Sequence, residues 1–184
     1  MRKIVVILFL NALLAGGPVH ASDNLSKANA LFGSARYQDA LPLYQSLLSS
    51  PPQKTSMGGI HTKIADCYYH LGLYKNAIES HRAALNLEDR ASQPETRYWI
   101  GFCCLLLGQN EQAVNEFLKI PELYPEAAMW SSTAYYWAGR ASERLGWKAK
   151  AAEFYKMAGG NGKSTQGRYA MKRAENMNRG ASSK

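Results

Sequence analysis

The sequence predicts an all-α fold, a solenoid of about four stacked helix-turn-helix units with a C-terminal capping helix. The first observation behind this prediction is a repeated phrase: RYWIGFCCLLLG at residues 97–108 returns as YYWAGRASERLG at residues 135–146. The Tyr-Trp-x-Gly motif keeps its place in both copies. The second observation is a set of equivalent alanines, spaced by 37, 36 and 38 residues, at Ala40, Ala77, Ala113 and Ala151. A fixed period of this length is typical of stacked helical repeats.

Composition is consistent with one folded domain. The chain has 184 residues, of which 46% are hydrophobic and 20% charged. A chain with this balance can bury a core, so composition excludes a disordered tail. The length suffices for one domain of ordinary size.

Residues 1–21 have the layout of a cleavable secretory signal peptide. Arg2 and Lys3 precede an apolar run at residues 4–14, and small residues follow up to Ala21. The run is much shorter than the roughly 20 residues that cross a bilayer. We therefore expect cleavage after Ala21, no transmembrane segment afterwards, and a periplasmic location. Secretion from the cell is the alternative.

Residues 22–160 form the predicted repeat domain, in which every copy has two helix-period runs separated by a break. A small residue in each first helix should let the second helix approach closely. These residues are Ala28, Ala65, Gly101 and Gly139. An aromatic residue four positions after the repeat alanine is expected to fill the gap to the next pair. These residues are Tyr44, Phe117 and Tyr155, with His81 in the second copy.

Glycine and proline mark the ends of the predicted helices. We expect Gly72, Gly108 and Gly146 at helix C termini, where the chain adopts a left-handed conformation. The first copy has Ala35 at this place. Two prolines, Pro52 and Pro125, should stop return helices, and Pro42 would kink its helix unless it lies in the first turn.

Residues 71–87, LGLYKNAIESHRAALNL, resemble the turn and second helix of the tetratricopeptide repeat family. The resemblance covers residues 24–158 and implies a right-handed superhelix. The spacing exceeds the family's repeat of about 34 residues, which we assign to longer loops. The Tyr-Trp-x-Gly motif together with LYPEAAMWSSTA is similar to a bacterial envelope branch. That branch includes the Tol–Pal-associated periplasmic coordinator and the lipoprotein of the outer-membrane assembly machine, and the repeats ahead of soluble lytic transglycosylases are related.

The resemblance also implies a concave inner wall, lined by first helices, that binds a protein or peptide partner. The family's geometry places on this wall Thr62, Asp66, Tyr69, Tyr98, Phe102, Leu105, Tyr136, Arg140 and Arg144. Aromatic and arginine side chains are frequent at interface hot spots, which favours binding. The alternative is that Phe102 and Leu105 only pack between repeats. We expect Trp99 and Trp137 in the core. Thr62 and Asp66 stand where some chaperone-binding members carry a carboxylate clamp of Lys and Asn, so that clamp is not expected.

Residues 161–184 form the predicted basic capping helix and tail. From residue 140 to the C terminus there are eleven Lys or Arg and three Glu, a net charge of +8. The basic patch is predicted at Lys148, Lys150, Lys163, Arg168, Lys172 and Arg173. Such a patch suits an anionic envelope surface, such as lipid head groups or peptidoglycan carboxylates. The alternative is a solvated cap, and nucleic acid is not an expected partner.

No motif predicts catalysis, a metal or a cofactor. The segment GGNGKST lacks the first glycine of a phosphate loop and follows a helix. His61, His70 and His81 with Cys67 lack metal-ligand spacing. We expect Cys67, Cys103 and Cys104 to be buried thiols. The predicted function is therefore a non-enzymatic periplasmic scaffold or adaptor. The alternative is a non-catalytic accessory protein of a cell-wall hydrolase, or a module that binds peptidoglycan or another anionic surface.

Overall fold

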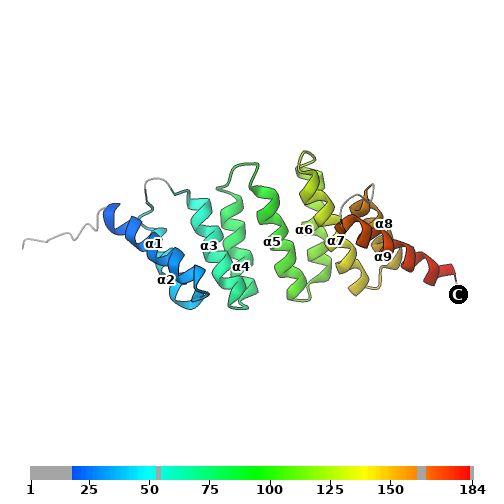
Figure 1. The fold of residues 1–184 in the computed structure, drawn as a ribbon, viewed down its shortest axis with the longest axis horizontal. Coiled ribbons are helices and arrows are strands. Elements are labelled where there is room, and N and C mark those ends of the chain that lie inside the picture. The colour runs from blue at the N-terminus through cyan, green and yellow to red at the C-terminus, as the bar shows by residue number, and fades with distance from the viewer. Residues whose placement is uncertain (1–17, 53–54, 161–164, 183–184) are drawn as a thin grey trace, which may run out of the picture.

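The structure is a computed structural model that describes residues 18–52, 55–160 and 165–182 (Figure 1). These residues form helices and contain no strand, which confirms the all-α prediction. In chain order the helices are α1 (Pro18–Gly33), α2 (Tyr37–Leu47), α3 (Met57–His70), α4 (Tyr74–Leu85), α5 (Gln93–Leu106), α6 (Asn110–Leu123), α7 (Ala128–Arg144), α8 (Lys148–Gly159) and α9 (Thr165–Ser182).

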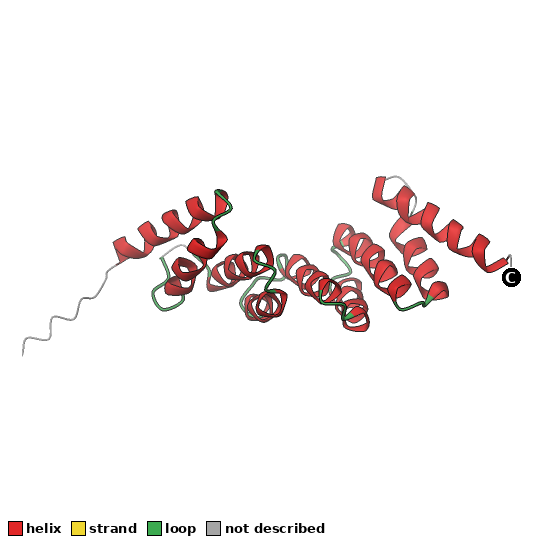
Figure 2. Ribbon diagram, turned by 90° about the horizontal axis from the view of Figure 1, so that it is seen from below, coloured by secondary structure: helices red, strands yellow, loops and turns green. Residues whose placement is uncertain are grey.

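Consecutive helices pack against one another as hairpins, α1 with α2 and so on to α7 with α8. The last helix, α9, packs mainly on α8 and also touches α7. The hairpins follow one another along a shallow arc, and α1 and α9 rise on the same side at its two ends (Figure 2). This arrangement confirms the predicted helical solenoid of about four repeats with a C-terminal cap.

Small residues of the first helices lie against aromatic rings of the return helices. A Cβ atom added at Gly101 would lie 2.9 Å from the Phe117 ring, and one added at Gly139 would lie 2.7 Å from the Tyr155 ring. The ring therefore fills the space inside its own hairpin. The prediction that this ring fills the gap to the next hairpin is therefore wrong, because the small residue it contacts belongs to the same hairpin.

The turn residues have the predicted conformation. Gly72, Gly108 and Gly146 have φ angles of 73°, 74° and 73°. Ala35 occupies the equivalent place in the first hairpin with a φ of 57°, the one non-glycine residue with positive φ in the described part of the chain. The same turn geometry thus recurs in all four hairpins, although one copy lacks the residue that adopts it without strain.

The prolines agree only in part with their predicted roles. The α6 helix ends two residues before Pro125, as expected, but α2 ends at Leu47, well before Pro52. Pro42 is the sixth residue of α2, beyond the first turn, so its missing N–H and its ring fall where they favour a kink. Pro121 lies inside α6 near its end.

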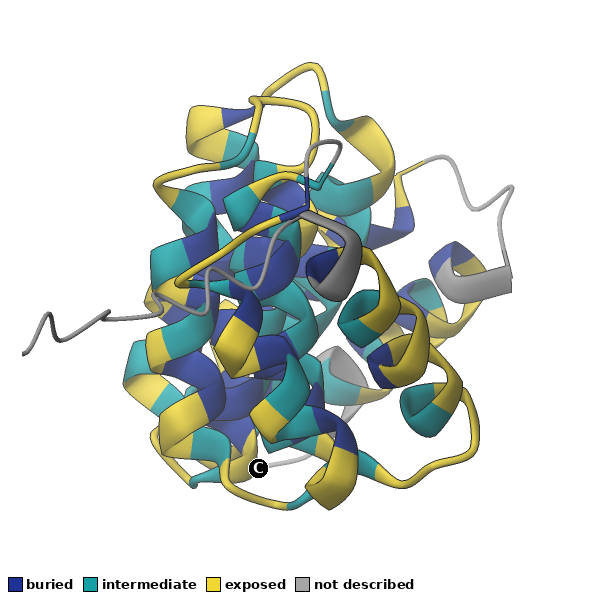
Figure 3. Ribbon diagram, turned by 90° about the vertical axis from the view of Figure 1, so that its left-hand side faces the viewer, coloured by how far each residue is buried: buried dark blue, intermediate teal, exposed yellow. Residues whose placement is uncertain are grey.

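Buried residues, dark blue in Figure 3, lie mainly where helices face one another. They form three clusters, one over α1 to α3, the largest from α4 to α7, and one between α8 and α9. Ala21, where we predict cleavage, lies in the first cluster and is 5% exposed. Cleavage there would remove the first turn of α1. The rest of the predicted signal peptide, residues 1–17, lies outside the described residues.

Candidate binding surface on the first helices

Aromatic rings from three successive first helices touch one another. Tyr69 on α3 lies 6.3 Å from Phe102 on α5, measured between ring centroids. Phe102 in turn meets Trp137 on α7 edge-on at 4.9 Å. All three side chains are half-buried. We call these three rings, together with their neighbours Tyr98, Trp99 and Tyr136, the aromatic ladder.

Other aromatic residues widen the ladder on each helix. Tyr98 stacks on Phe102 with a centroid distance of 5.8 Å and an interplanar angle of 18°. Tyr136 contacts Trp137 edge-on at 5.6 Å, and Trp99 contacts Tyr69 edge-on at 5.2 Å. The ladder therefore includes four of the predicted groove residues and joins them across α3, α5 and α7.

The predicted core role of Trp99 and Trp137 holds for Trp137 only in part, and Trp99 lies outside the core clusters. Both are half-buried. Trp137 packs against the largest core cluster, whereas Trp99 makes its ring contacts with Tyr69, Tyr98 and Phe102. Trp99 follows Tyr98, and Trp137 follows Tyr136, in the Tyr-Trp-x-Gly motif. This adjacency to two predicted wall residues could have placed both tryptophans on the same surface.

Phe102 and Leu105 differ in burial, which bears on whether they line a binding surface or only pack between repeats. Leu105 is 2% exposed and belongs to the largest core cluster, so it packs between repeats. Phe102 packs against that cluster too, but it stays half-exposed and is the ring that links α3 to α7.

Asp66, Phe102 and Arg140 occupy equivalent places, each directly after the small residue of its first helix. The Asp66 side chain is 26% exposed and lies 3.7 Å from Lys63. Burial raises the pKa of Asp66, an effect that Lys63 and His70 partly offset. Arg140 is 35% exposed and lies 3.7 Å from Glu143, and its guanidinium lies 6.0 Å from the Trp137 ring centroid.

Two predicted wall residues make hydrogen bonds that link successive first helices, Arg144 directly and Thr62 through Glu88 in the loop between α4 and α5. The Nη1 of Arg144 donates to the backbone oxygen of Leu105 at 2.9 Å. The Thr62 hydroxyl donates to Glu88 at 2.8 Å, and Glu88 also accepts a hydrogen bond from Thr96 at 2.6 Å. These bonds tie α3, α5 and α7 together, so Thr62 and Arg144 have a structural role at the positions predicted for the wall.

The residues of the predicted basic patch differ in exposure and pairing. Lys148, Lys150, Arg168 and Lys172 are exposed, and Lys163 lies outside the described residues. Arg173 differs, because its Nη2 lies 2.7 Å from Glu143 and its Nε 3.0 Å from the Tyr155 hydroxyl. The Arg173 charge is therefore compensated inside the molecule, so this residue contributes less than its formal charge to the predicted basic patch.

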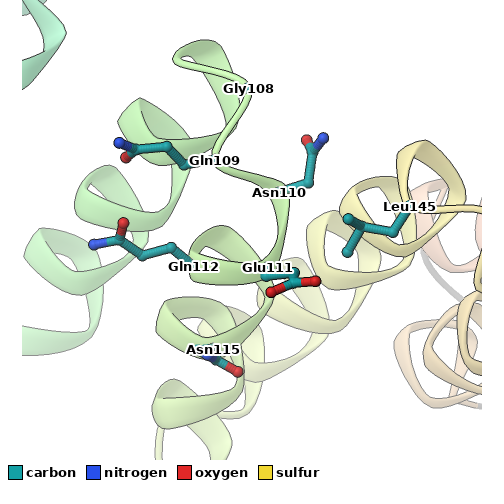
Figure 4. Close-up of a pocket in the computed structure, with 7 residues that line it drawn as sticks. All are labelled: Gly108, Gln109, Asn110, Glu111, Gln112, Asn115 and Leu145. Atoms are coloured by element: carbon teal, nitrogen blue, oxygen red, sulfur yellow. The ribbon is translucent and has the colours of Figure 1, made fainter.

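A hollow at the turn between α5 and α6 is lined by Gly108, Gln109, Asn110, Glu111, Gln112, Asn115 and Leu145 (Figure 4). In the close-up, Gln109 and Gln112 point away from Leu145, so the polar groups do not converge on one point. We assign no site to it.

The described residues contain neither a metal-binding cluster nor a helix that could cross a membrane, and their three cysteines are buried. No group of three His, Cys, Asp or Glu side chains there could hold a metal ion. No helix within the same residues is both long and apolar enough to cross a membrane. All three cysteines are buried free thiols, as expected. Burial raises the pKa of Cys67 to about 11 and that of Cys103 to about 12.

The fold and this wall define a class of protein, the helical-repeat solenoids. Two family models match the chain: "Anaphase-promoting complex, cyclosome, subunit 3" at residues 33–120 and "Tetratricopeptide repeat" at residues 132–158. These matches, with the fold, support the tetratricopeptide repeat family. Direct comparison with curated proteins finds no match.

Solved structures share the fold at low sequence identity. The apo form of RapI superposes with a TM-score of 0.76 at 15% identity, over 87% of this chain and 48% of RapI. The chain thus spans about half the length of RapI. A tetratricopeptide repeat protein from Parabacteroides merdae gives 0.69 at 17% identity, over 86% and 60%. PcrH in complex with the chaperone-binding region of PopD gives 0.57 at 16% identity, over 72% and 98%.

Proposed function

We propose that this protein is a scaffold that binds a segment of another protein along the inner face of its first helices. The aromatic ladder is the observation that carries the proposal, because half-buried rings from three repeats form one continuous surface. Aromatic and arginine side chains dominate binding energy at protein interfaces. PcrH, which has a similar fold, is described in complex with a region of PopD, which supports binding of a segment of another protein by this kind of fold.

The binding proposal is tested with two variants, Phe102→Ala and Arg140→Ala, used as bait in a pull-down from a periplasmic extract. We expect each to lose at least tenfold in partner capture, because hot-spot truncations commonly cost about 2 kcal/mol. Tyr169→Ala is the matched control, since Tyr169 is 66% exposed on α9, away from the ladder. Full capture by both variants, with helix content unchanged by circular dichroism, would contradict the proposal.

We further propose that the scaffold works in the bacterial envelope, as the signal-like residues 1–21 and the resemblance of the motif suggest. Fractionation should find the protein in the periplasm with Ser22 as its first residue. A chain lacking residues 1–21 is the control and should stay in the cytoplasm. A full-length chain that retains Met1 in the cytoplasmic fraction would contradict the location and leave the binding proposal standing.

A second candidate function is an accessory role to a cell-wall hydrolase, with contact to peptidoglycan or another anionic surface. Exposed lysines at the start of α8 and on α9, Lys148, Lys150 and Lys172, favour it. Binding to anionic vesicles or isolated peptidoglycan should appear at low salt and fall as salt is added, because exposed charges are screened. No binding at low salt would remove this candidate.

A further inference from the structure

We infer that the inner face selects an extended peptide segment with an apolar centre, a basic side chain at one end and an acidic side chain at the other, about six residues apart. This inference rests on the proposed function and names the chemistry of the partner. It follows from the order of charges along one row of equivalent positions.

The row runs from Asp66 on α3 through Phe102 on α5 to Arg140 on α7. The three residues hold the same repeat position, so the fold presents them in succession along the arc. Their chemistry changes from acidic through aromatic to basic. Neither charged side chain is sealed in the core, with 26% and 35% exposed.

The α7 end of the row is positive. Arg140 lies 3.7 Å from Glu143, but Glu143 already pairs with Arg173 at 2.7 Å and accepts the Tyr155 hydroxyl at 2.6 Å. One carboxylate thus faces two guanidinium groups, and exposed Arg144 lies near the end of the same helix. The local excess of positive charge suits a carboxylate on the partner.

The α3 end is negative. The carboxylate of Glu95, exposed in the first turn of α5, acts on Asp66 as a like charge. Lys63 offsets Asp66 at 3.7 Å and also lies 4.8 Å from the centroid of the Phe32 ring. The imidazole of His70 also acts on Asp66 as a positive charge when protonated. With histidine counted as neutral at pH 7, two carboxylates face one ammonium, and this excess of negative charge suits a Lys or Arg side chain.

The spacing of helices sets the length of the segment. Side chains of successive first helices meet at Phe102, which contacts Tyr69 on α3 and Trp137 on α7. We therefore take each of the two repeat steps as about one helix-packing distance, 8–10 Å, so the row from α3 to α7 covers roughly 20 Å. An extended chain advances about 3.3 Å per residue, so the second charged residue follows about six positions after the first, with five residues between them. The aromatic ladder lies between the ends and suits apolar side chains there.

Four synthetic peptides with blocked termini test this inference on the full chain. They share the centre Ser-Trp-Leu-Trp-Ser and differ in their first and last residues, which are Lys/Glu, Lys/Lys, Glu/Glu or Gln/Gln. We expect the Lys/Glu peptide to bind about tenfold more tightly than the Gln/Gln peptide, measured by fluorescence anisotropy. The Arg140→Glu variant should lose this preference, whereas Lys75→Glu, a charge reversal on the exposed start of α4, should keep it.

The charge order and the inner face fail under different results of these measurements. Equal affinity for the Lys/Glu and Gln/Gln peptides, with both lost in Phe102→Ala, would overturn the charge order and keep the scaffold. An Arg140→Glu variant that retains the wild-type ranking would also overturn the charge order. Absence of binding by all four peptides at millimolar concentration, or binding that Phe102→Ala leaves intact, would count against the inner face itself.

Discussion

A Cβ atom added at Gly139 would lie 2.7 Å from Cε1 of Tyr155, so α7 and α8 are in direct contact at this point. The ring cannot easily move away, because Tyr155 is fully buried and its hydroxyl donates to Glu143 at 2.6 Å. The close packing of α7 against α8 therefore depends on the absence of a Cβ atom at residue 139. The same relationship between Gly101 and Phe117 holds α5 to α6.

We predict that Gly139→Ala destabilises the protein by about 1–3 kcal/mol, the usual cost of overpacking a core. Urea unfolding followed by circular dichroism measures the change. Gly33→Ala is the control, because Gly33 ends α1 with ordinary φ and has no atom within 4 Å of the added Cβ. That variant should be neutral or more stable, and a loss equal to that of Gly139→Ala would contradict the explanation.

The positive φ of Ala35 predicts a stabilising substitution. Ala35→Gly should raise the free energy of unfolding by about 0.5–1 kcal/mol, because the left-handed conformation is strained for alanine and not for glycine. The reverse change at the equivalent turn, Gly72→Ala, should lower it by about 1 kcal/mol. Two changes of the same sign would show that the turns are not equivalent. Thermal unfolding of both variants beside the wild type provides the measurement.

Because His81 is buried, we expect the folded protein to lose stability in mild acid. It is 1% exposed, and neither ring nitrogen has a hydrogen-bond partner in the described part of the chain. Burial lowers its pKa from 6.5 to about 4. The unfolded chain therefore binds a proton between these values while the folded chain does not, so stability is full above pH 6.5 and falls as the pH drops towards 4.

The total loss from His81 should be roughly 3 kcal/mol, since each pKa unit corresponds to about 1.4 kcal/mol. His81→Phe restores the aromatic residue that the third repeat has at this position, Phe117. We expect it to reduce the slope of stability between pH 4 and 6.5, measured by urea unfolding at several pH values. His70→Phe is the control, because His70 is exposed. An unchanged slope in His81→Phe would contradict the assignment.

The ion pair of Arg173 should stabilise the packing of α9, the C-terminal capping helix. Its pairing with Glu143 at 2.7 Å joins α9 to α7. Arg173→Ala should therefore speed amide hydrogen exchange in α9 about tenfold relative to Lys172→Ala, which removes an exposed charge beside it. Similar exchange in the two variants would mean that the apolar contacts of Ala170 and Ala174 hold the cap alone.

The cysteines predict slow reaction with thiol reagents. Cys67, Cys103 and Cys104 are fully buried, and burial raises the pKa of Cys104 to about 11. Because the thiolate is the reactive form, native protein at pH 8 should react at least a hundredfold more slowly than protein in denaturant. Three thiols should titrate after unfolding. Fewer than three in the unfolded, unreduced protein would indicate a disulfide.

The repeat phrase was sufficient to predict the helices, their turns and their small residues, because these depend on contacts that are local or that recur at every period. Ala35 and Gly72 have the same turn geometry since each ends a first helix in the same way. The inner wall was predicted only as a row of positions, since equivalent places in stacked repeats face the same way.

The contacts between repeats had to come from the three-dimensional arrangement. The linking of Tyr69, Phe102 and Trp137 in one ladder, and the compensation of Arg173 by Glu143, involve residues 30 or more positions apart. Whether such side chains meet depends on how far each hairpin turns relative to the last, and no short pattern of residues contains that angle. The angle between successive hairpins is set by packing along the whole arc, because the arrangement that buries the most ring area and pairs the most charge is the most stable.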